Sequence, residues 1–268
     1  MSREWRPEEN PRAVVGLIHG LGEHCGRYSH MAERFTKEQI ALIAFDLRGH
    51  GRSEGQRGDA PSFEAYMRDL DVFQQQIEAR FNKMPCFLYG HSMGGLFLLN
   101  YLIRRQPKIL GAVSSAAGLH TPLTRQKVKM ALVQTLSRLT PKLAIPSGLD
   151  ANAISRDQAV VQRYKTDPMV HDLVTLRMAQ ATIPAIDFVF QHAGQIDVPL
   201  LILHGTGDRL TYASGSEELA RKVPQAKLIL FEGLAHELHN EPEKESVFET
   251  VLKWMQDLMV KEADLDSS

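Results

Sequence analysis

The sequence is poor in cysteine, has no excess of either charge and contains no long apolar run. Its two cysteines in 268 residues, Cys25 and Cys86, are too few for a disulfide framework and form no C-x-x-C pair. We therefore expect reduced thiols and a cytoplasmic location. The net charge of −1 offers no basic field for nucleic-acid phosphates, so no nucleic-acid partner is expected.

Segments that would enter or cross a membrane are also missing from the sequence. No stretch approaches the roughly 18 consecutive apolar residues of a spanning helix. Residues 1–10 are mostly polar and lack the apolar centre of a secretory leader. Any membrane association is therefore expected to be peripheral.

Short, continuous apolar runs recur along the chain, and helical patterns separate them. The runs cover residues 13–18, 41–45, 87–89, 110–113, 200–203 and 227–231. Such runs are typical of parallel strands that helices cover on both faces. The sequence therefore predicts an α/β fold with a mostly parallel central sheet.

The most informative motif is Gly90-His91-Ser92-Met93-Gly94, which lies between a strand-like run and a helix-like run. A serine on so sharp a strand-to-helix turn needs very small residues two positions before and after it, and both are glycine. The helix that begins after the serine points free N–H groups toward the atom under attack. The motif predicts a nucleophile elbow with Ser92 as the nucleophile.

A serine nucleophile needs a base, and the base needs an acid that fixes its tautomer. In this fold the three residues follow one another as nucleophile, acid and histidine. Asp208 follows the strand-like run 200–203, and His236 lies on the loop after the run 227–231. We therefore predict a catalytic triad of Ser92, Asp208 and His236.

Other residues compete for the two partner roles. His239 is only three positions beyond His236, but it lies further from the end of its strand. Asp197 precedes its strand and so points to the wrong edge of the sheet, and Glu232 directly follows the last strand as a weaker alternative. None of the three displaces the predicted pair.

The oxyanion formed during acyl transfer needs two backbone N–H donors. One comes from the residue after the nucleophile and the other from the loop after the first core strand. These positions are Met93 and, within His19-Gly20-Leu21-Gly22, Leu21. We predict their N–H groups as the oxyanion hole.

A large insertion separates two of the predicted strands. Residues 116–197 are far more than the roughly 30 residues of a complete βαβ unit. Apolar spacing over 128–139 predicts one helix, and a capping box of Ser155 with Gln158 predicts another that Asp167-Pro168 ends. We expect a helical cap at 119–185 between two parts of one core, 1–118 and 186–268.

The cap is locally basic. Between Thr121 and Leu149 there is no acidic residue, and the basic residues are Arg125, Lys127, Lys129, Arg138 and Lys142. A basic, amphipathic segment could contact an anionic lipid surface peripherally. The alternative is an ordinary solvated outer face.

Several of these motifs together resemble the monoacylglycerol lipases and lysophospholipase-like serine hydrolases of the α/β-hydrolase superfamily. The resemblance spans roughly residues 12–260 and includes His19-Gly20-Leu21-Gly22-Glu23-His24, the elbow, and Ser155-Arg156-Asp157 in the cap. It implies the α/β-hydrolase fold and a triad of Ser92, Asp208 and His236. It also implies cleavage of a monoacylglycerol or similar lipid ester through an acyl-enzyme intermediate.

Other functions remain open at this point. A general carboxylesterase or lysophospholipase would use the same site, and a non-catalytic binding protein could share the fold. Gly20-Leu21-Gly22 suggests a dinucleotide site, but the third glycine of that motif would fall at Cys25. His19, Glu23 and His24 match no metal-ligand pattern, so neither a metal nor another cofactor is expected.

Overall fold

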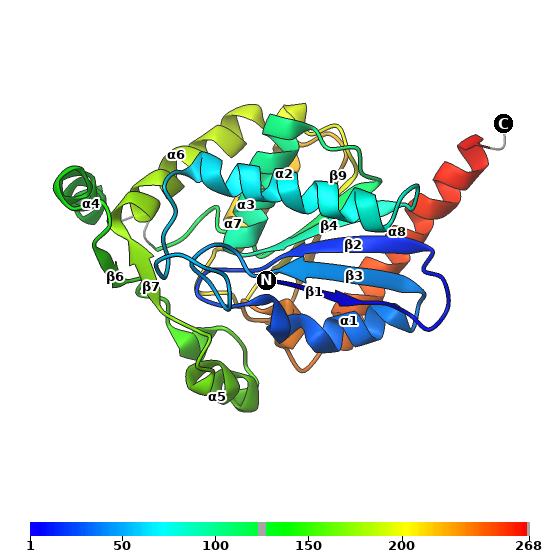
Figure 1. The fold of residues 1–268 in the computed structure, drawn as a ribbon, viewed down its shortest axis with the longest axis horizontal. Helices are drawn as coiled ribbons and strands as arrows, with labels where there is room; N and C mark the ends of the chain where they lie inside the picture. Colours follow the sequence, from blue (N-terminus) through cyan, green and yellow to red (C-terminus); the bar gives the residue numbers. More distant parts are fainter. Residues whose placement is uncertain (123–126, 267–268) are drawn as a thin grey trace.

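The computed structural model describes residues 1–122 and 127–266, and a seven-stranded sheet forms its centre (Figure 1). The strand order is β1-β3-β2-β4-β5-β8-β9, and every neighbouring pair is parallel except β1 with β3. The strands are β1 (Ser2–Trp5), β2 (Ala13–Ile18), β3 (Ile40–Phe45), β4 (Cys86–His91), β5 (Gly111–Ser115), β8 (Leu200–Gly205) and β9 (Ala226–Phe231). The predicted α/β fold with a mostly parallel sheet is confirmed.

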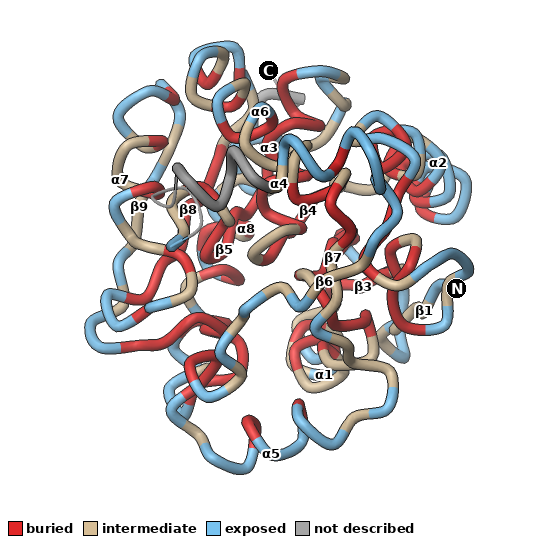
Figure 2. Tube along the Cα trace, turned by 90° about the vertical axis from the view of Figure 1, so that its left-hand side faces the viewer, coloured by how far each residue is buried: buried red, intermediate tan, exposed pale blue. Residues whose placement is uncertain are grey.

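Helices cover both faces of the sheet, as continuous apolar strands require. One face packs against α1 (Ser29–Thr36) and α8 (Lys244–Asp266), and the other against α2 (Phe63–Arg80), α3 (Met93–Arg105), α6 (Leu176–His192) and α7 (Ala213–Lys222). Successive strand residues alternate between the two cores: Val14 belongs to one and Val15 to the other. Figure 2 shows β4, β5 and β8 buried among these layers.

The chain between β5 and β8 forms an insertion at one end of the molecule (Figure 1). It contains α4 (Lys127–Leu139), β6 (Ala144–Pro146), the short 3-10 helix η3 (Ala151–Ala153), α5 (Gln158–Thr166) and β7 (Leu173–Thr175), and it ends in α6. Strands β6 and β7 pair antiparallel. Backbone hydrogen bonds join the insertion to loops of the core, from His171 N–H to Gly22 and from Thr175 N–H to Gly58.

The predicted capping box at Ser155 is wrong. The N-cap of α5 is Asp157, whose carboxylate accepts from the Ala159 N–H at 2.8 Å. The Ser155 hydroxyl instead lies 2.7 Å from the Glu241 carboxylate, far away in the sequence. This tertiary partner outcompetes the local cap, while the predicted end of the helix before Asp167 is confirmed.

No described helix combines the length and apolarity that crossing a bilayer requires.

Candidate active site

Ser92 lies at the sharp turn between β4 and α3. Its φ of 53° and ψ of −117° fall outside the regions that a serine normally adopts, so the turn is strained. The flanking glycines make this turn sterically feasible: a Cβ on Gly90 would lie 2.6 Å from the Gly94 carbonyl oxygen, and one on Gly94 only 2.2 Å from that of Ile18. The sequence forms an elbow that pushes the hydroxyl away from the backbone.

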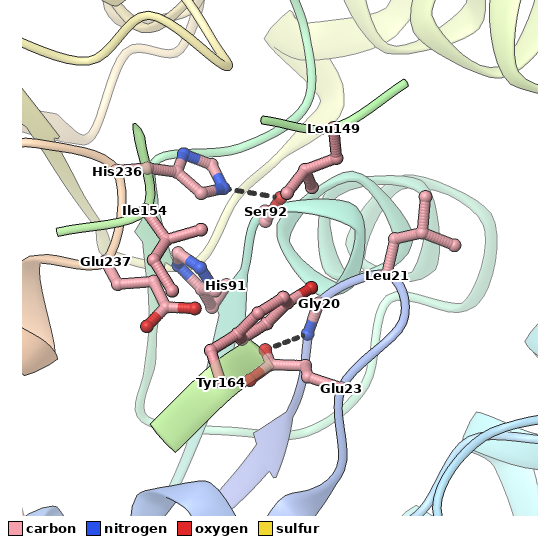
Figure 3. Close-up of a pocket in the computed structure, with 10 residues that line it drawn as sticks. All are labelled: Gly20, Leu21, Glu23, His91, Ser92, Leu149, Ile154, Tyr164, His236 and Glu237. Atoms are coloured by element: carbon pink, nitrogen blue, oxygen red, sulfur yellow. Dashed lines mark hydrogen bonds between the residues drawn. The ribbon is translucent and has the colours of Figure 1, made fainter. Parts of the chain in front are cut away.

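The structure brings Ser92, His236 and Asp208 into one hydrogen-bonded series. The Ser92 hydroxyl lies 2.9 Å from Nε2 of His236, a contact marked by a dashed line in Figure 3, and Nδ1 of His236 lies 2.7 Å from Oδ2 of Asp208. Asp208 follows β8, and His236 lies on the loop after β9, here called the histidine loop (residues 232–241). Residues distant in sequence meet because parallel strands end at the same edge of the sheet.

Asp208 is held by several donors besides His236. Its Oδ1 accepts the N–H groups of Leu210 at 2.8 Å and Thr211 at 3.0 Å, and its Oδ2 accepts the Thr211 hydroxyl at 2.8 Å. Nε2 of the buried His204 lies 3.2 Å from Oδ2. We did not predict Thr211 or His204, although an aspartate followed by turn residues often binds the backbone N–H groups two and three positions on.

The charges of His236 and Asp208 reinforce one another. Burial alone raises the pKa of Asp208, but the charge of His236 and hydrogen bonds from His204 and His236 bring it well below its ordinary value. Burial lowers the pKa of His236, yet the charge and hydrogen bond of Asp208, together with the charges of Glu237 and Glu23, raise that pKa above its ordinary value. The pair therefore supplies a base whose imidazolium form is stabilised.

The competing residues lie elsewhere. His239 is buried, and within the described part of the chain neither of its ring nitrogens has a hydrogen-bond partner. Burial, together with the neighbouring rings of His91 and His30, lowers the pKa of His239 well below its usual range. Asp197 and Glu232 are exposed. Among the described residues, none of these three alternatives takes part in the hydrogen-bonded series at Ser92.

The two predicted oxyanion donors flank Ser92. Met93 is the first residue of α3, so its N–H has no acceptor within that helix. Leu21 lines the same cavity as Ser92, while the N–H of the preceding Gly20 is already bonded to the Glu23 carboxylate at 2.6 Å (Figure 3). The Glu23 contact therefore occupies the Gly20 N–H, and the Leu21 N–H stays the predicted donor from this loop.

A largely buried ion network joins residues 23–27, which follow β2, to the histidine loop, and we did not predict it. Arg27 lies 2.6 Å from Glu23 and donates two hydrogen bonds of 2.7 Å to Glu237, the residue after His236. The Arg27 guanidinium also lies 4.7 Å from the ring centre of Tyr164 in α5. Two carboxylates against one guanidinium leave a net negative charge near His236, and both raise its pKa.

The cavity beside Ser92 is narrow and of mixed polarity. Its free volume is about 10 Å³, room for roughly one water molecule. The residues that line it are Gly20, Leu21, Glu23, His91, Ser92, Leu149, Ile154, Tyr164, His236 and Glu237. Three of them, Leu149, Ile154 and Tyr164, belong to the insertion, which therefore forms part of the wall of the site.

Ser92 lies on a strained turn of a mostly parallel sheet, and His236 is within its reach. These features place this chain among the serine hydrolases of the α/β-hydrolase fold. The chain belongs to the Hydrolase_4 family, described as "Serine aminopeptidase, S33", which it matches over residues 9–243.

Individual relatives narrow this assignment. The monoacylglycerol lipase of Mycolicibacterium smegmatis is 36% identical over 261 residues, covering 94% of this chain and 90% of that protein. An uncharacterized abhydrolase domain-containing protein of Dictyostelium discoideum is also 36% identical, over 95% of this chain, which spans only 27% of that protein's length. The crystal structure of Paleococcus ferrophilus monoacylglycerol lipase superposes with a TM-score of 0.87 at 33% identity, covering 96% and 98% of the two chains. The predicted resemblance to monoacylglycerol lipase-like serine hydrolases is confirmed, and the chain is a carboxylic ester hydrolase.

Proposed function

We propose that this protein hydrolyses the acyl ester bond of monoacylglycerols, with Ser92, His236 and Asp208 as the catalytic triad. The observation that carries the proposal is the continuous series from Asp208 through His236 to the Ser92 hydroxyl, with contacts of 2.7 and 2.9 Å. These are hydrogen-bond distances for a base that must take a proton from a nucleophile.

The reaction proceeds in two acyl transfers. His236 takes the Ser92 proton as the hydroxyl oxygen attacks the ester carbonyl, and the N–H groups of Leu21 and Met93 stabilise the oxyanion. His236 then gives the proton to the departing alcohol oxygen, which leaves Ser92 acylated. Water, deprotonated by the same imidazole, attacks the acyl carbon, and the bond from that carbon to the Ser92 oxygen breaks as His236 returns the proton to this oxygen, which releases the fatty acid. Asp208 keeps the tautomer of His236 correct in both halves.

The lining of the cavity supports an ester with unlike ends. Leu21, Leu149 and Ile154 contribute apolar surface that suits an acyl chain, while Glu23 and Glu237 contribute carboxylates that suit a polar alcohol. Monoacylglycerols combine these two parts. The names of the Mycolicibacterium and Paleococcus relatives support the same substrate class.

We further propose that residues 119–185 act as a cap over a core formed by residues 1–118 and 186–268. Helix α6 crosses residue 185, so the cap continues into the core through one helix. The free volume of about 10 Å³ beside Ser92 cannot hold an acyl chain. Movement of Leu149, Ile154 or Tyr164 would enlarge this space for an acyl chain.

A substrate panel tests the proposed function. We expect long-chain monoacylglycerols to be cleaved at least roughly tenfold faster, by kcat/KM, than di- and triacylglycerols of the same acyl chain, since a narrow site excludes the extra chains. The measurement is fatty-acid release across the panel, with lysophosphatidylcholine and p-nitrophenyl esters alongside. Preference for lysophosphatidylcholine would favour a lysophospholipase, and equal rates on all simple esters a general carboxylesterase.

We also propose that the cap contacts anionic lipid surfaces peripherally. Leu139 and Leu143 are 77% and 51% exposed, and the exposed cations Arg138 and Lys142 neighbour them. Apolar and cationic groups side by side suit an anionic membrane interface. Lys127 and Lys129 belong to α4, while Arg125 lies outside the described residues. The cytoplasmic location remains a prediction.

Replacing Leu139 and Leu143 together by serine should weaken binding to phosphatidylglycerol vesicles roughly tenfold, because the insertion of two apolar side chains is lost. Co-sedimentation with vesicles measures this change. Val72→Ser removes another apolar side chain, 57% exposed on α2, and should leave binding unchanged. Equal vesicle binding by the unsubstituted protein, the double variant and Val72→Ser would show that the outer face of the cap is merely solvated.

A further inference from the structure

Glu241 is a buried carboxylate that the mechanism above does not use. It directly follows the 3-10 helix η5 (Leu238–Asn240), and its side chain is 0% exposed. A buried charge is destabilising unless donors surround it. Burial raises the pKa of Glu241, but hydrogen bonds from Ala235, Arg156 and Ser155 bring it below its ordinary value. The group is therefore charged at neutral pH.

The donors to Glu241 come from two separate parts of the chain. Oε1 accepts the Ser155 hydroxyl at 2.7 Å and the Arg156 N–H at 2.6 Å, both from the insertion. Oε2 accepts Nε of Arg156 at 2.5 Å and the N–H of Ala235 at 3.0 Å. Ala235 immediately precedes His236. One carboxylate thus joins the insertion to the histidine loop.

The peptide on the other side of His236 is held by the same part of the insertion. The Glu237 N–H donates to the Ile154 carbonyl at 2.7 Å. Ile154 directly precedes the two residues that bind Glu241, and it lines the catalytic cavity (Figure 3). Of the two N–H groups that flank His236, one is therefore held by Ile154 of the insertion, and the other by Glu241, whose carboxylate Ser155 and Arg156 in turn bind.

We propose that Glu241 is a positioning residue for His236. It holds the His236 imidazole within reach of Ser92 only while residues 154–156 are in contact with the histidine loop. The inference rests on the proposed role of His236 as the base. Displacement of a catalytic group by about 1 Å can cost roughly 100-fold in rate, so a small loosening of this contact matters. The triad is then assembled only when residues 154–156 contact the histidine loop.

Glu241→Gln changes the side-chain volume little, but the amide cannot accept hydrogen bonds at both positions as the carboxylate does. The glutamine oxygen can accept from the donors at Oε1 or from those at Oε2, but its NH₂ group then faces the other donors. Glu243→Gln is the matched control: Glu243 also binds Arg156, from the exposed side, and has no contact with Ala235. The two variants remove the same charge two positions apart.

The experiment compares three measurements in the full-length variants. These are the rate constant for labelling of Ser92 by a fluorophosphonate, kcat for p-nitrophenyl acetate, and KM for a monoacylglycerol. We expect Glu241→Gln to lower the labelling rate and kcat roughly 10- to 100-fold, because both need a positioned His236. Glu243→Gln should stay within about twofold of the unsubstituted protein.

A folded Glu241→Gln protein that labels at the unsubstituted rate, or that changes only KM for the long ester, would overturn the proposal. If this variant does not fold, Ser155→Ala tests the proposal instead, since it removes one hydrogen-bond donor to Glu241 from the insertion. A lowered labelling rate supports the proposal, and an unchanged one overturns it. Failure of the unsubstituted protein to label at all would instead reject the proposed function and this inference together.

Discussion

Replacing Ser92 with alanine is expected to lower kcat for monoacylglycerol hydrolysis by roughly 10⁶-fold, the loss seen when a serine protease loses its nucleophile. No other hydroxyl is hydrogen-bonded to Nε2 of His236 among the described residues. Alanine keeps the Cβ and the strained backbone angles of the elbow, so the fold should be retained. Fatty-acid release and fluorophosphonate labelling measure the loss, and circular dichroism checks the fold.

Ser214→Ala is the matched control for this experiment. The exposed Ser214 lies 3.0 Å from Nδ1 of His120, whose other nitrogen lies 3.5 Å from Glu218. This surface arrangement has the residue types of a triad, but it lacks the strained turn and the burial of the site at Ser92. Activity and labelling should be unchanged in Ser214→Ala. Loss of labelling here with retention in Ser92→Ala would reverse the assignment.

The positions of the predicted site residues could be derived from sequence because each depends on a local pattern. The apolar runs mark the strands, and the two glycines around Ser92 mark the only kind of turn that exposes a side chain in this way. Asp208 and His236 follow strands of a parallel sheet, whose ends lie at one edge. Proximity in space follows from that topology, although the residues are far apart in the chain.

Strand β1 shows where local pattern was insufficient. Its residues Ser2–Trp5 include Arg3 and Glu4 and form no apolar run, so the sequence predicts no strand. The strand forms because β3 presents an unpaired edge to it, and antiparallel pairing there tolerates charged side chains. Its stability comes from a partner that is more than thirty residues away.

The polar contacts around the triad were equally hidden. Arg27 is charged and would be expected at the surface, yet its side chain is only 9% exposed and lies between Glu23 and Glu237, which come from two different loops. Ser155 has the sequence of a helix cap but bonds to Glu241 instead. Such contacts depend on the convergence of side chains from separate loops, for which a single sequence contains no periodic signal. Only the structure reveals that charged neighbours hold the proposed catalytic groups.

Asp208→Asn is expected to lower kcat by roughly 10⁴-fold, the loss measured for the equivalent change in a serine protease. Asparagine can present its NH₂ group to Nδ1 of His236 and thereby favour the tautomer that has its proton on Nε2. That tautomer cannot accept a proton from Ser92. Asp197→Asn, at an exposed aspartate before β8, should leave kcat unchanged and so controls for the loss of one negative charge.

The pH dependence of the residual activity distinguishes this role from simple destabilisation. His236 acts as a base only when neutral, so activity should fall as the pH decreases through its pKa. The Asp208 carboxylate raises that pKa. Its removal should therefore lower the pKa of His236 and move the acid limb of kcat/KM to lower pH, which a pH–rate profile measures. An acid limb that stays in place would mean that Asp208 does not interact with the charge on His236, because loss of folded protein alone would lower the rate equally at every pH where the fold is stable.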